Sequence, residues 1–224
     1  MAFNGGKMPH IFVFDRDSKP PVYTDQFHSE EAAKALELGS FFVKIDGSNG
    51  MLHLVSNDQA VTCYQRRDTK GKPFPPGSIP LPDARNEATY EGHSYCYEPI
   101  LRDVIGKKLQ KRNAAILDLV ERHREYLLSL NAKEWISVEW IGRQFNRTPG
   151  VPEEVGLAIH AQQRVEVDFP RTYDGLRDYL GTTAIEGLIV EHEGYYWKVR
   201  SDCFDRPSPF RENRESVPPP TYLS

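Results

Sequence analysis

Two short apolar runs, residues 41–45 and 51–55, flank a polar segment with two glycines, and this stretch constrains the chain most. The pattern predicts a strand, a tight turn and a second strand. Lys44 falls at the end of the first strand, with Asp46 two residues later and Gly47 at the bend. A lysine partly buried at a strand end loses charge stabilisation, and its amine can then act as a nucleophile. The alternative is an exposed lysine beside an ordinary hairpin, so Lys44 needs partners elsewhere in the chain.

Length and composition predict a globular protein with a core of its own. The chain has 224 residues, of which 39% are hydrophobic and 27% charged, enough for one sizeable domain or two small ones. Its formal net charge of -4 excludes a general nucleic-acid coat protein. Any contact with nucleic acid must therefore come from a local basic patch.

The cysteine and histidine patterns exclude several classes of site. The three cysteines are widely spaced and form no Cys-x-x-Cys pair, which excludes a disulfide framework and a cysteine-based zinc site. The seven histidines are scattered singly, which argues against a metal hydrolase. The cysteine spacing fits a reducing compartment, so we expect an intracellular protein, in the cytoplasm or nucleus. No apolar segment reaches 18 residues, so no membrane span is predicted. No long apolar stretch follows the N-terminal lysine, so no signal peptide is predicted.

Three segments are predicted to be helices. Residues 29–39 begin with Ser29 as a possible N-cap, and residues 172–180 begin with Thr172 and stop at Gly181. The third segment, residues 103–130, carries one apolar stripe, and a charged pair at i,i+4 is expected on its outer side. The stripe consists of Ile105, Leu109, Ile116, Val120 and Leu127, and the pair is Asp118 with Arg122.

The remaining apolar runs are predicted to be strands, which makes the chain a single α+β domain. A loop is expected over residues 73–93, and the proline-rich tail, residues 206–224, is expected to be extended and mobile. The predicted strands are residues 11–14, 51–55, 60–64, 93–98, 135–141, 157–160, 164–167, 184–191 and 195–200.

Two acids stand on apolar strands. Along residues 135–141, Ile136, Val138 and Trp140 share one face, so Glu139 faces the other way. A lone acid on such a strand either has a partner or lies on a wet face. The second acid, Glu186, precedes a glycine at the start of an apolar strand.

Two cations close the last predicted strand. The period of two places Lys198 and Arg200 on one face, where they repel each other unless an anion lies between them. A phosphate is the obvious candidate, and a solvated strand end is the alternative. A further basic segment covers residues 65–72.

These features occur once each and in a fixed order, which resembles the covalent nucleotidyltransferase superfamily of polynucleotide ligases and messenger-RNA capping enzymes. The resemblance covers roughly residues 40–205. The sequence Lys44-Ile45-Asp46-Gly47 resembles the first motif of the superfamily, with Lys44 as its nucleophile. The later motifs have matches in the same order: the basic residue of the next motif is matched by Arg66 and the third motif by Val138-Glu139. The fourth motif is matched by Glu186-Gly187-Leu188-Ile189-Val190, and the fifth by Trp197-Lys198-Val199-Arg200.

Within the superfamily, the chain is most similar to the small 5′–3′ RNA ligases of animals and some viruses. The similarity lies in residues 66–70 and 138–142, with Asn146 and Pro149 shortly after. Arg200 departs from the usual lysine of the fifth motif, and arginine also binds phosphate. DNA ligases and capping enzymes carry a C-terminal OB domain. Only 24 residues follow Arg200, so no such domain is expected.

The resemblance implies an ATP-grasp-like ligase adenylation domain over residues 1–205, with antiparallel sheets and flanking helices. It implies ATP and Mg²⁺ (or Mn²⁺) as cofactors, a lysine–AMP intermediate, and RNA with 5′-phosphate and 3′-hydroxyl ends as partner; a monomer is expected. Besides the nucleophile Lys44, it implies nucleotide contacts from Asp46, Gly47, Arg66, Glu139, Glu186, Lys198 and Arg200. It implies metal contacts from Glu139 and Glu186, and RNA contacts from Arg67, Lys70 and Lys72.

Two alternatives remain within this fold. One is a GTP-dependent guanylyltransferase that caps messenger RNA, and the missing OB sequence weighs against it. The other is a catalytically inactive RNA-binding module. The chain keeps every ionisable residue that the chemistry needs, which weighs against inactivity.

Overall fold

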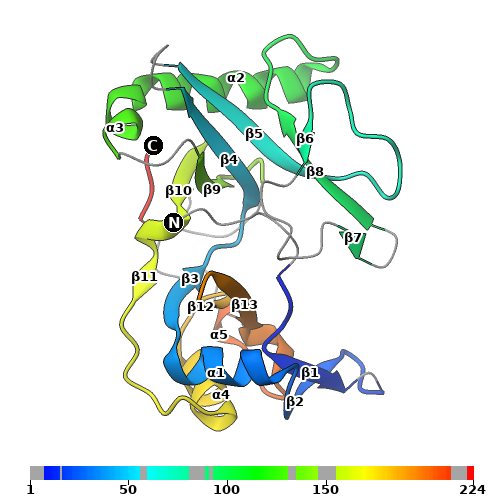
Figure 1. The fold of residues 1–224 in the computed structure, drawn as a ribbon, viewed down its shortest axis with the longest axis vertical. Helices are drawn as coiled ribbons and strands as arrows, with labels where there is room; N and C mark the ends of the chain where they lie inside the picture. The colour runs from blue at the N-terminus through cyan, green and yellow to red at the C-terminus, as the bar shows by residue number, and fades with distance from the viewer. Residues whose placement is uncertain are drawn as a thin grey trace.

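The computed structural model describes residues 8–15, 17–55, 60–80, 89–90, 93–130, 135–145, 155–212 and 221–224. Asn146 and Pro149 lie outside these residues. Figure 1 shows two halves stacked along the long axis of the molecule, each built on its own antiparallel sheet. The fold is therefore α+β, as the sequence predicts. No described helix is both long and apolar enough to cross a membrane.

The smaller half is built on a sheet with strand order β11-β3-β12-β13, which we call the small sheet. Alternate side chains, such as Phe41, Val190 and Val199, point to one face and form a core with helices α1 and α4. A hairpin, β1-β2, and the short helix α5 complete this half. The elements are β1 (Phe12–Asp15), β2 (Val22–Phe27), α1 (Glu30–Leu38), β3 (Ser40–Lys44), β11 (Arg164–Val165), α4 (Tyr173–Thr182), β12 (Gly187–His192), β13 (Tyr195–Arg200) and α5 (Pro209–Glu212).

The larger half is built on a sheet with strand order β10-β9-β4-β5-β8-β6, the large sheet, and β7 pairs with β8 outside this order. One face packs against helices α2 and α3 through residues such as Val138, Trp140 and Ile116. Its elements are β4 (Ser48–Val55), β5 (Ala60–Asp68), β6 (Ile79–Pro80), β7 (Thr89–Tyr90), β8 (His93–Pro99), α2 (Lys107–Arg122), α3 (Arg124–Ser129), β9 (Trp135–Ile141) and β10 (Gly156–Ile159).

Within the described residues, the chain passes between the halves at two neighbouring places; a further crossing, between α5 and residues 221–224, lies outside the described residues. It leaves the small sheet after β3 and enters β4 through residues 45–47 (Figure 1). It returns after β10 through a 3₁₀ turn, η1 (His160–Gln162). The two passages lie together, because β3 pairs with β11 and the amide of Val43 donates to the carbonyl of Gln163 at 2.9 Å.

Both predicted N-caps are present. The hydroxyl of Ser29 accepts from the amide of Ala32, and that of Thr172 accepts from the amide of Gly175, each at 3.1 Å. Each bond satisfies an amide that has no partner inside the helix. Helix α4 continues to Thr182, so the expectation that Gly181 stops it is wrong.

The prediction for residues 103–130 needs three corrections. The segment forms two helices, α2 and α3, separated at His123. Ile105 precedes α2 and is 99% exposed, so the apolar stripe begins later than expected. Asp118 pairs with Arg102 at 2.5 Å, rather than with Arg122.

Some loops also contain more structure than predicted. Strand β2 was not predicted, and β6 and β7 fall within the expected loop of residues 73–93. Two of the predicted strands are shorter: β11 ends at Val165, and β12 begins at Gly187. Strand β10 is shifted by one residue and ends at Ile159.

The described parts of the C-terminal segment differ from the extended, mobile tail that was expected. Residues 209–212 form α5, and Phe210 is buried. Leu223 exchanges backbone hydrogen bonds of 2.9 and 2.8 Å with Leu157 of β10. Tyr222 packs against Ile45, at the passage between the halves. Apolar side chains hold this segment down, despite its many prolines.

Candidate functional site

A pocket of about 330 Å³ lies between the two sheets and is lined from both. It opens where β3 ends and β4 begins, so the sequence stretch around Lys44 forms part of its wall. The lining residues are Met8, Lys44, Ile45, Gly47, Ser48, Asn49, Arg66, Glu139, His160, Glu186, Ile189, Lys198 and Arg200.

The small-sheet wall carries three of the four lysine and arginine side chains that line the pocket; the fourth, Arg66, lies on β5 of the large sheet. Gly187 lies opposite Lys44 on one side and opposite Arg200 on the other, so both cations project from the same face. Lys198 lies two residues before Arg200 and shares that face. A Cβ atom at position 187 would lie 2.0 Å from the carbonyl oxygen of Val199, so only glycine fits between the two cationic strands.

Glu186 links the two cations. Its Oε2 lies 2.5 Å from Nζ of Lys44, and its Oε1 lies 3.9 Å from Nε of Arg200. The side chain of Glu186 is only 11% exposed. Burial raises the pKa of this carboxyl, and the ammonium of Lys44 opposes the shift without cancelling it.

Arg200 is held in place by its other nitrogen atoms. Nη2 donates to Oδ2 of Asp202 at 2.8 Å. Burial lowers the pKa of Arg200, but the neighbouring acidic groups, with Asp202 the largest, together outweigh burial and leave the pKa raised. The guanidinium therefore stays charged. Its buried Nε finds no hydrogen-bond acceptor among the described residues, which leaves one donor for an anion.

The large-sheet wall is a network of hydrogen bonds. Nε2 of His160 lies 3.0 Å from Oε2 of Glu139, and its Nδ1 lies 2.8 Å from the hydroxyl of Ser137. One neutral tautomer satisfies both contacts, with Nε2 donating to the carboxylate and Nδ1 accepting from the hydroxyl. Beside Glu139 on the sheet, Asn49 accepts from the hydroxyl of Tyr97 at 2.8 Å.

The turn that joins the two walls packs closely on Glu139. A Cβ atom at Gly47 would lie 2.5 Å from Cγ of Glu139 and 2.7 Å from the carbonyl oxygen of Trp140. Because Gly47 has no side chain, the backbone that joins the two halves can pack directly against the side chain of Glu139. Asp46 does not line the pocket, but its charge contributes to the raised pKa of Glu186.

The structure gathers most of the residues predicted for nucleotide binding. Asp46 is the one predicted nucleotide contact outside the pocket lining. The three predicted RNA contacts, Arg67, Lys70 and Lys72, are also outside the lining. Arg67 points away from the pocket, because β5 alternates, and its Nη1 bonds both carboxylate oxygens of Glu98 at 2.8 and 2.7 Å. Lys70 and Lys72 are exposed at the turn after β5. The gathered residues are Lys44, Gly47, Arg66, Glu139, Glu186, Lys198 and Arg200.

Sequence reasoning missed several lining residues. His160 was assigned to a strand end and then dismissed with the other histidines, although it bonds Glu139. A polar residue directly after an apolar run was the available signal. Asn49 carried a weaker signal, as an amide inside the predicted turn. Met8 and Ile189 carried none, because their roles depend on contacts between distant segments.

The pocket supplies oxygen ligands suited to Mg²⁺, but not a complete metal cage. Among the residues that the structure describes, no three histidine, cysteine or acidic side chains cluster to hold a metal ion. Glu139 and Glu186 both line the pocket, and Mg²⁺ is commonly held by one or two carboxylates plus substrate phosphates. The donor set therefore fits a metal that arrives with a nucleotide.

No protein-family model matches the chain, and no curated protein matches it.

Proposed function

We propose that this chain is an ATP-dependent RNA ligase that joins 5′-phosphate and 3′-hydroxyl RNA ends through a lysine–AMP intermediate. One observation carries the proposal: the amine of Lys44 lies in a pocket beside two further cations, Lys198 and Arg200, and against Glu186. A lysine nucleophile needs a base for its protons and positive charge for the phosphate that it attacks. The motif order described above supports the same chemistry.

In the first step, neutral Nζ of Lys44 attacks the α-phosphorus of ATP. A P–N bond forms while the bond from the α-phosphorus to the bridging oxygen breaks, and pyrophosphate leaves with the electron pair. The ammonium of Lys44 loses one proton to become the neutral amine and a second as the P–N bond forms. Glu186, whose Oε2 lies 2.5 Å from Nζ, accepts the first, and the second passes to the leaving pyrophosphate or to water. Its raised pKa makes it a stronger base than an exposed glutamate.

The cations of the small-sheet wall hold the α-phosphate. Lys198 and Arg200 offset the negative charge that grows on its oxygens in the transition state. The buried Nε of Arg200 is a suitable donor for one of these oxygens. In the later steps, AMP moves to the 5′-phosphate of RNA, and a 3′-hydroxyl then displaces AMP to seal the strand.

Glu139 and Glu186 would hold Mg²⁺ (or Mn²⁺) together with the phosphates of ATP. The metal supplies positive charge to the pyrophosphate leaving group when it is bound. His160 fixes the carboxylate of Glu139 in the pocket, because both ring nitrogens are engaged.

The test is intact mass spectrometry of the protein after incubation with ATP and Mg²⁺. Wild type gains one AMP, while Lys44→Arg, which keeps a cation opposite Glu186 but removes the nucleophile, gains none. Lys34→Ala is a matched control, because Lys34 is an exposed lysine on α1. The charged enzyme then seals 5′-phosphorylated RNA.

Two outcomes would replace the proposal. Labelling from GTP but not ATP would make the chain a guanylyltransferase. No adduct with either nucleotide, from a folded protein, would leave an inactive binding module.

A further inference from the structure

A row of aromatic side chains leads away from the pocket along the large sheet. His53 and Trp135 lie opposite each other on β4 and β9, and their rings stack with centroids 4.2 Å apart and an interplanar angle of 17°. The ring of Tyr64 on β5 lies 5.7 Å from that of Trp135. These three residues form what we call the aromatic row, and Tyr95 on β8 lies beyond Arg66 from them, opposite Asp68.

The row joins the pocket through Arg66. This arginine lines the pocket, lies two residues after Tyr64 on β5, and places its guanidinium 5.6 Å from the ring centroid of Tyr95. Alternation along the strands places Glu139, Ser137 and Trp135 on the same face of β9. The pocket and the aromatic row are therefore two parts of one continuous surface.

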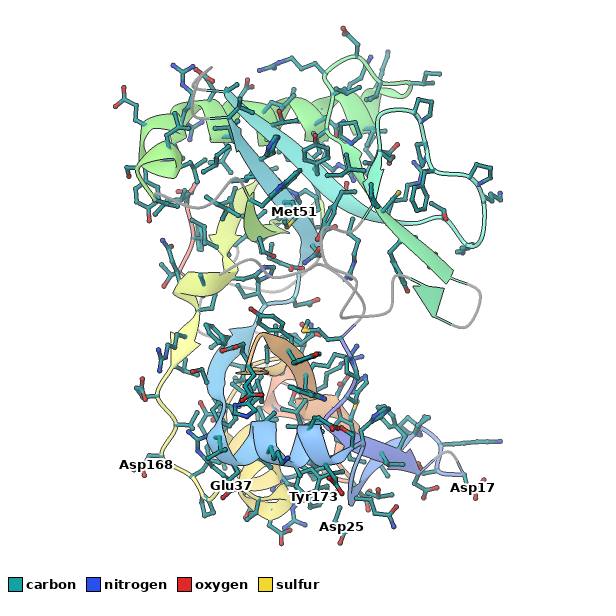
Figure 2. All side chains as sticks on the ribbon, in the orientation of Figure 1. Asp17, Asp25, Glu37, Met51, Asp168 and Tyr173 are labelled. Atoms are coloured by element: carbon teal, nitrogen blue, oxygen red, sulfur yellow. The ribbon has the colours of Figure 1, made fainter. Side chains whose placement is uncertain are left out.

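This face of the large sheet differs from the opposite one. The opposite face is covered by α2 and α3. On the face with the aromatic row, Met51 and Tyr97 are fully buried, but Tyr64, Tyr95 and Trp135 pack over them and stay partly exposed. No helix contributes to this cluster among the described residues. Met51, which belongs to this cluster, is labelled in Figure 2.

We infer that the aromatic row binds the unpaired bases of a single-stranded RNA whose end lies in the pocket. The inference rests on the proposed function, which brings an RNA end to Lys44. Stacking on aromatic rings is the general means of holding unpaired bases, and it tolerates any sequence. Arg66 supplies positive charge for the backbone where the row meets the pocket.

The dimensions suit a short single strand. Trp135 lies four residues before Glu139 on β9, about 13 Å along the strand at about 3.3 Å per residue. That length matches about four stacked nucleotides at about 3.4 Å each. A duplex keeps its bases stacked on one another, so it cannot offer their faces to the row. Single strands are therefore the preferred ligand.

Four acidic side chains lie at the opposite end of the molecule from the aromatic row. The carboxylates Asp17, Asp25, Glu37 and Asp168 lie on the outer edge of the small half, away from the aromatic row (Figure 2). The net charge of the chain is -4, yet these acids lie far from the surface proposed for RNA.

The test is fluorescence anisotropy with a labelled, 5′-phosphorylated RNA hexamer, a hexamer of abasic units with equal charge, and an RNA duplex. Wild type binds the hexamer most tightly. Trp135→Ala weakens that binding about tenfold, the size of one lost base–aromatic stack, and leaves binding of the abasic oligomer unchanged. Trp135→Phe keeps a ring at the position and binds within about threefold of wild type. Tyr195→Ala, which removes an exposed ring from the small sheet, binds as wild type does.

Tryptophan emission supplies a second readout. Trp140 and Trp197 are buried, so the hexamer quenches mainly the emission of Trp135, and Trp135→Phe loses this quenching while it keeps binding. Equal binding of the hexamer and the abasic oligomer, equal binding by Trp135→Ala and wild type, or preference for duplex would each overturn the inference. The AMP adduct is measured separately. If the adduct forms but RNA binding does not depend on Trp135, only this inference is wrong. If RNA binding depends on Trp135 but no adduct forms, only the ligase proposal is wrong.

Discussion

The two walls of the pocket use charge differently. On the small-sheet wall, Lys44, Lys198 and Arg200 face a single lining carboxylate, Glu186. On the large-sheet wall, Glu139 is engaged by His160, and Asn49 by Tyr97. The first wall has three cations to offer an anion, whereas the second has one, Arg66, and its acid and amide are already engaged in hydrogen bonds.

This difference separates two tasks in the proposed reaction. Charge that develops on a phosphate is best met by fixed cations, and their loss lowers the rate of the chemical step. A hydrogen-bonded wall instead holds parts of the substrate that do not react, and its loss weakens binding. Variants of the two walls should therefore differ in which kinetic constant changes.

The largest effect is expected from Lys198→Ala on the small-sheet wall. Loss of one fixed charge at the attacked phosphate should lower the rate of AMP-adduct formation about 10³-fold, with little change in the KM for ATP. Single-turnover mass spectrometry measures the rate. Lys198→Arg keeps the positive charge and should recover part of the lost rate. A near-normal rate for Lys198→Ala would remove this wall from the chemistry.

The next effect concerns the packing that keeps the cationic strands together. Gly187→Ala places a Cβ atom 2.0 Å from the carbonyl oxygen of Val199, so β12 and β13 must separate. We expect a loss of about 2–3 kcal/mol in the free energy of unfolding, measured with urea. Gly181→Ala is the control, because its Cβ meets only the flexible end of Arg206. Equal stability of the two variants would contradict the reason given for Gly187.

A smaller effect is expected from the large-sheet wall. His160→Phe leaves Glu139 without its donor, which should raise the KM for ATP about tenfold and change kcat less than threefold. Steady-state kinetics of pyrophosphate release separates the two constants. A fall in kcat with an unchanged KM would contradict the assignment of substrate binding to the large-sheet wall and of the chemical step to the small-sheet wall.

The smallest effect is a pH dependence of stability that originates at Glu186. Burial raises its pKa in the folded state above the value in the unfolded chain. The folded state then retains this proton more strongly, so the stabilisation is present below about pH 4.3 and is lost as the pH rises through the folded-state pKa. Wild type should lose stability relative to Glu186→Gln between pH 4 and 7 in urea unfolding. The opposite slope would mean that the pairing with Lys44 outweighs burial.

Local patterns predicted much of the fold. Ser29 and Thr172 cap helices because their hydroxyls accept from amides of the first helical turn. This bond is local, so it does not depend on where the helix packs. The period of two along residues 135–141 placed Glu139 on the opposite face from Trp140, and the structure confirms this alternation. Such features depend on neighbours within a few residues.

Contacts between distant segments were not predictable. Asp118 pairs with Arg102 because the loop before α2 folds back over the helix, and no spacing along the chain encodes that pair. His160 meets Glu139 only because β10 lies beside β9. The order of the motifs predicted the acidic, lysine and arginine residues that line the pocket, but it also included Asp46, which does not, and it did not predict which residue holds each one in place.

The two neighbouring passages between the halves also have a mechanical consequence. Lys44 lies at one passage and His160 at the other, and a hydrogen bond from Val43 to Gln163 ties the passages together. A rigid rotation of one half against the other would pivot about this tie, and displacement grows with distance from a pivot. Lys44 would then move little, while residues farther from the tie, such as those of the aromatic row, would move more.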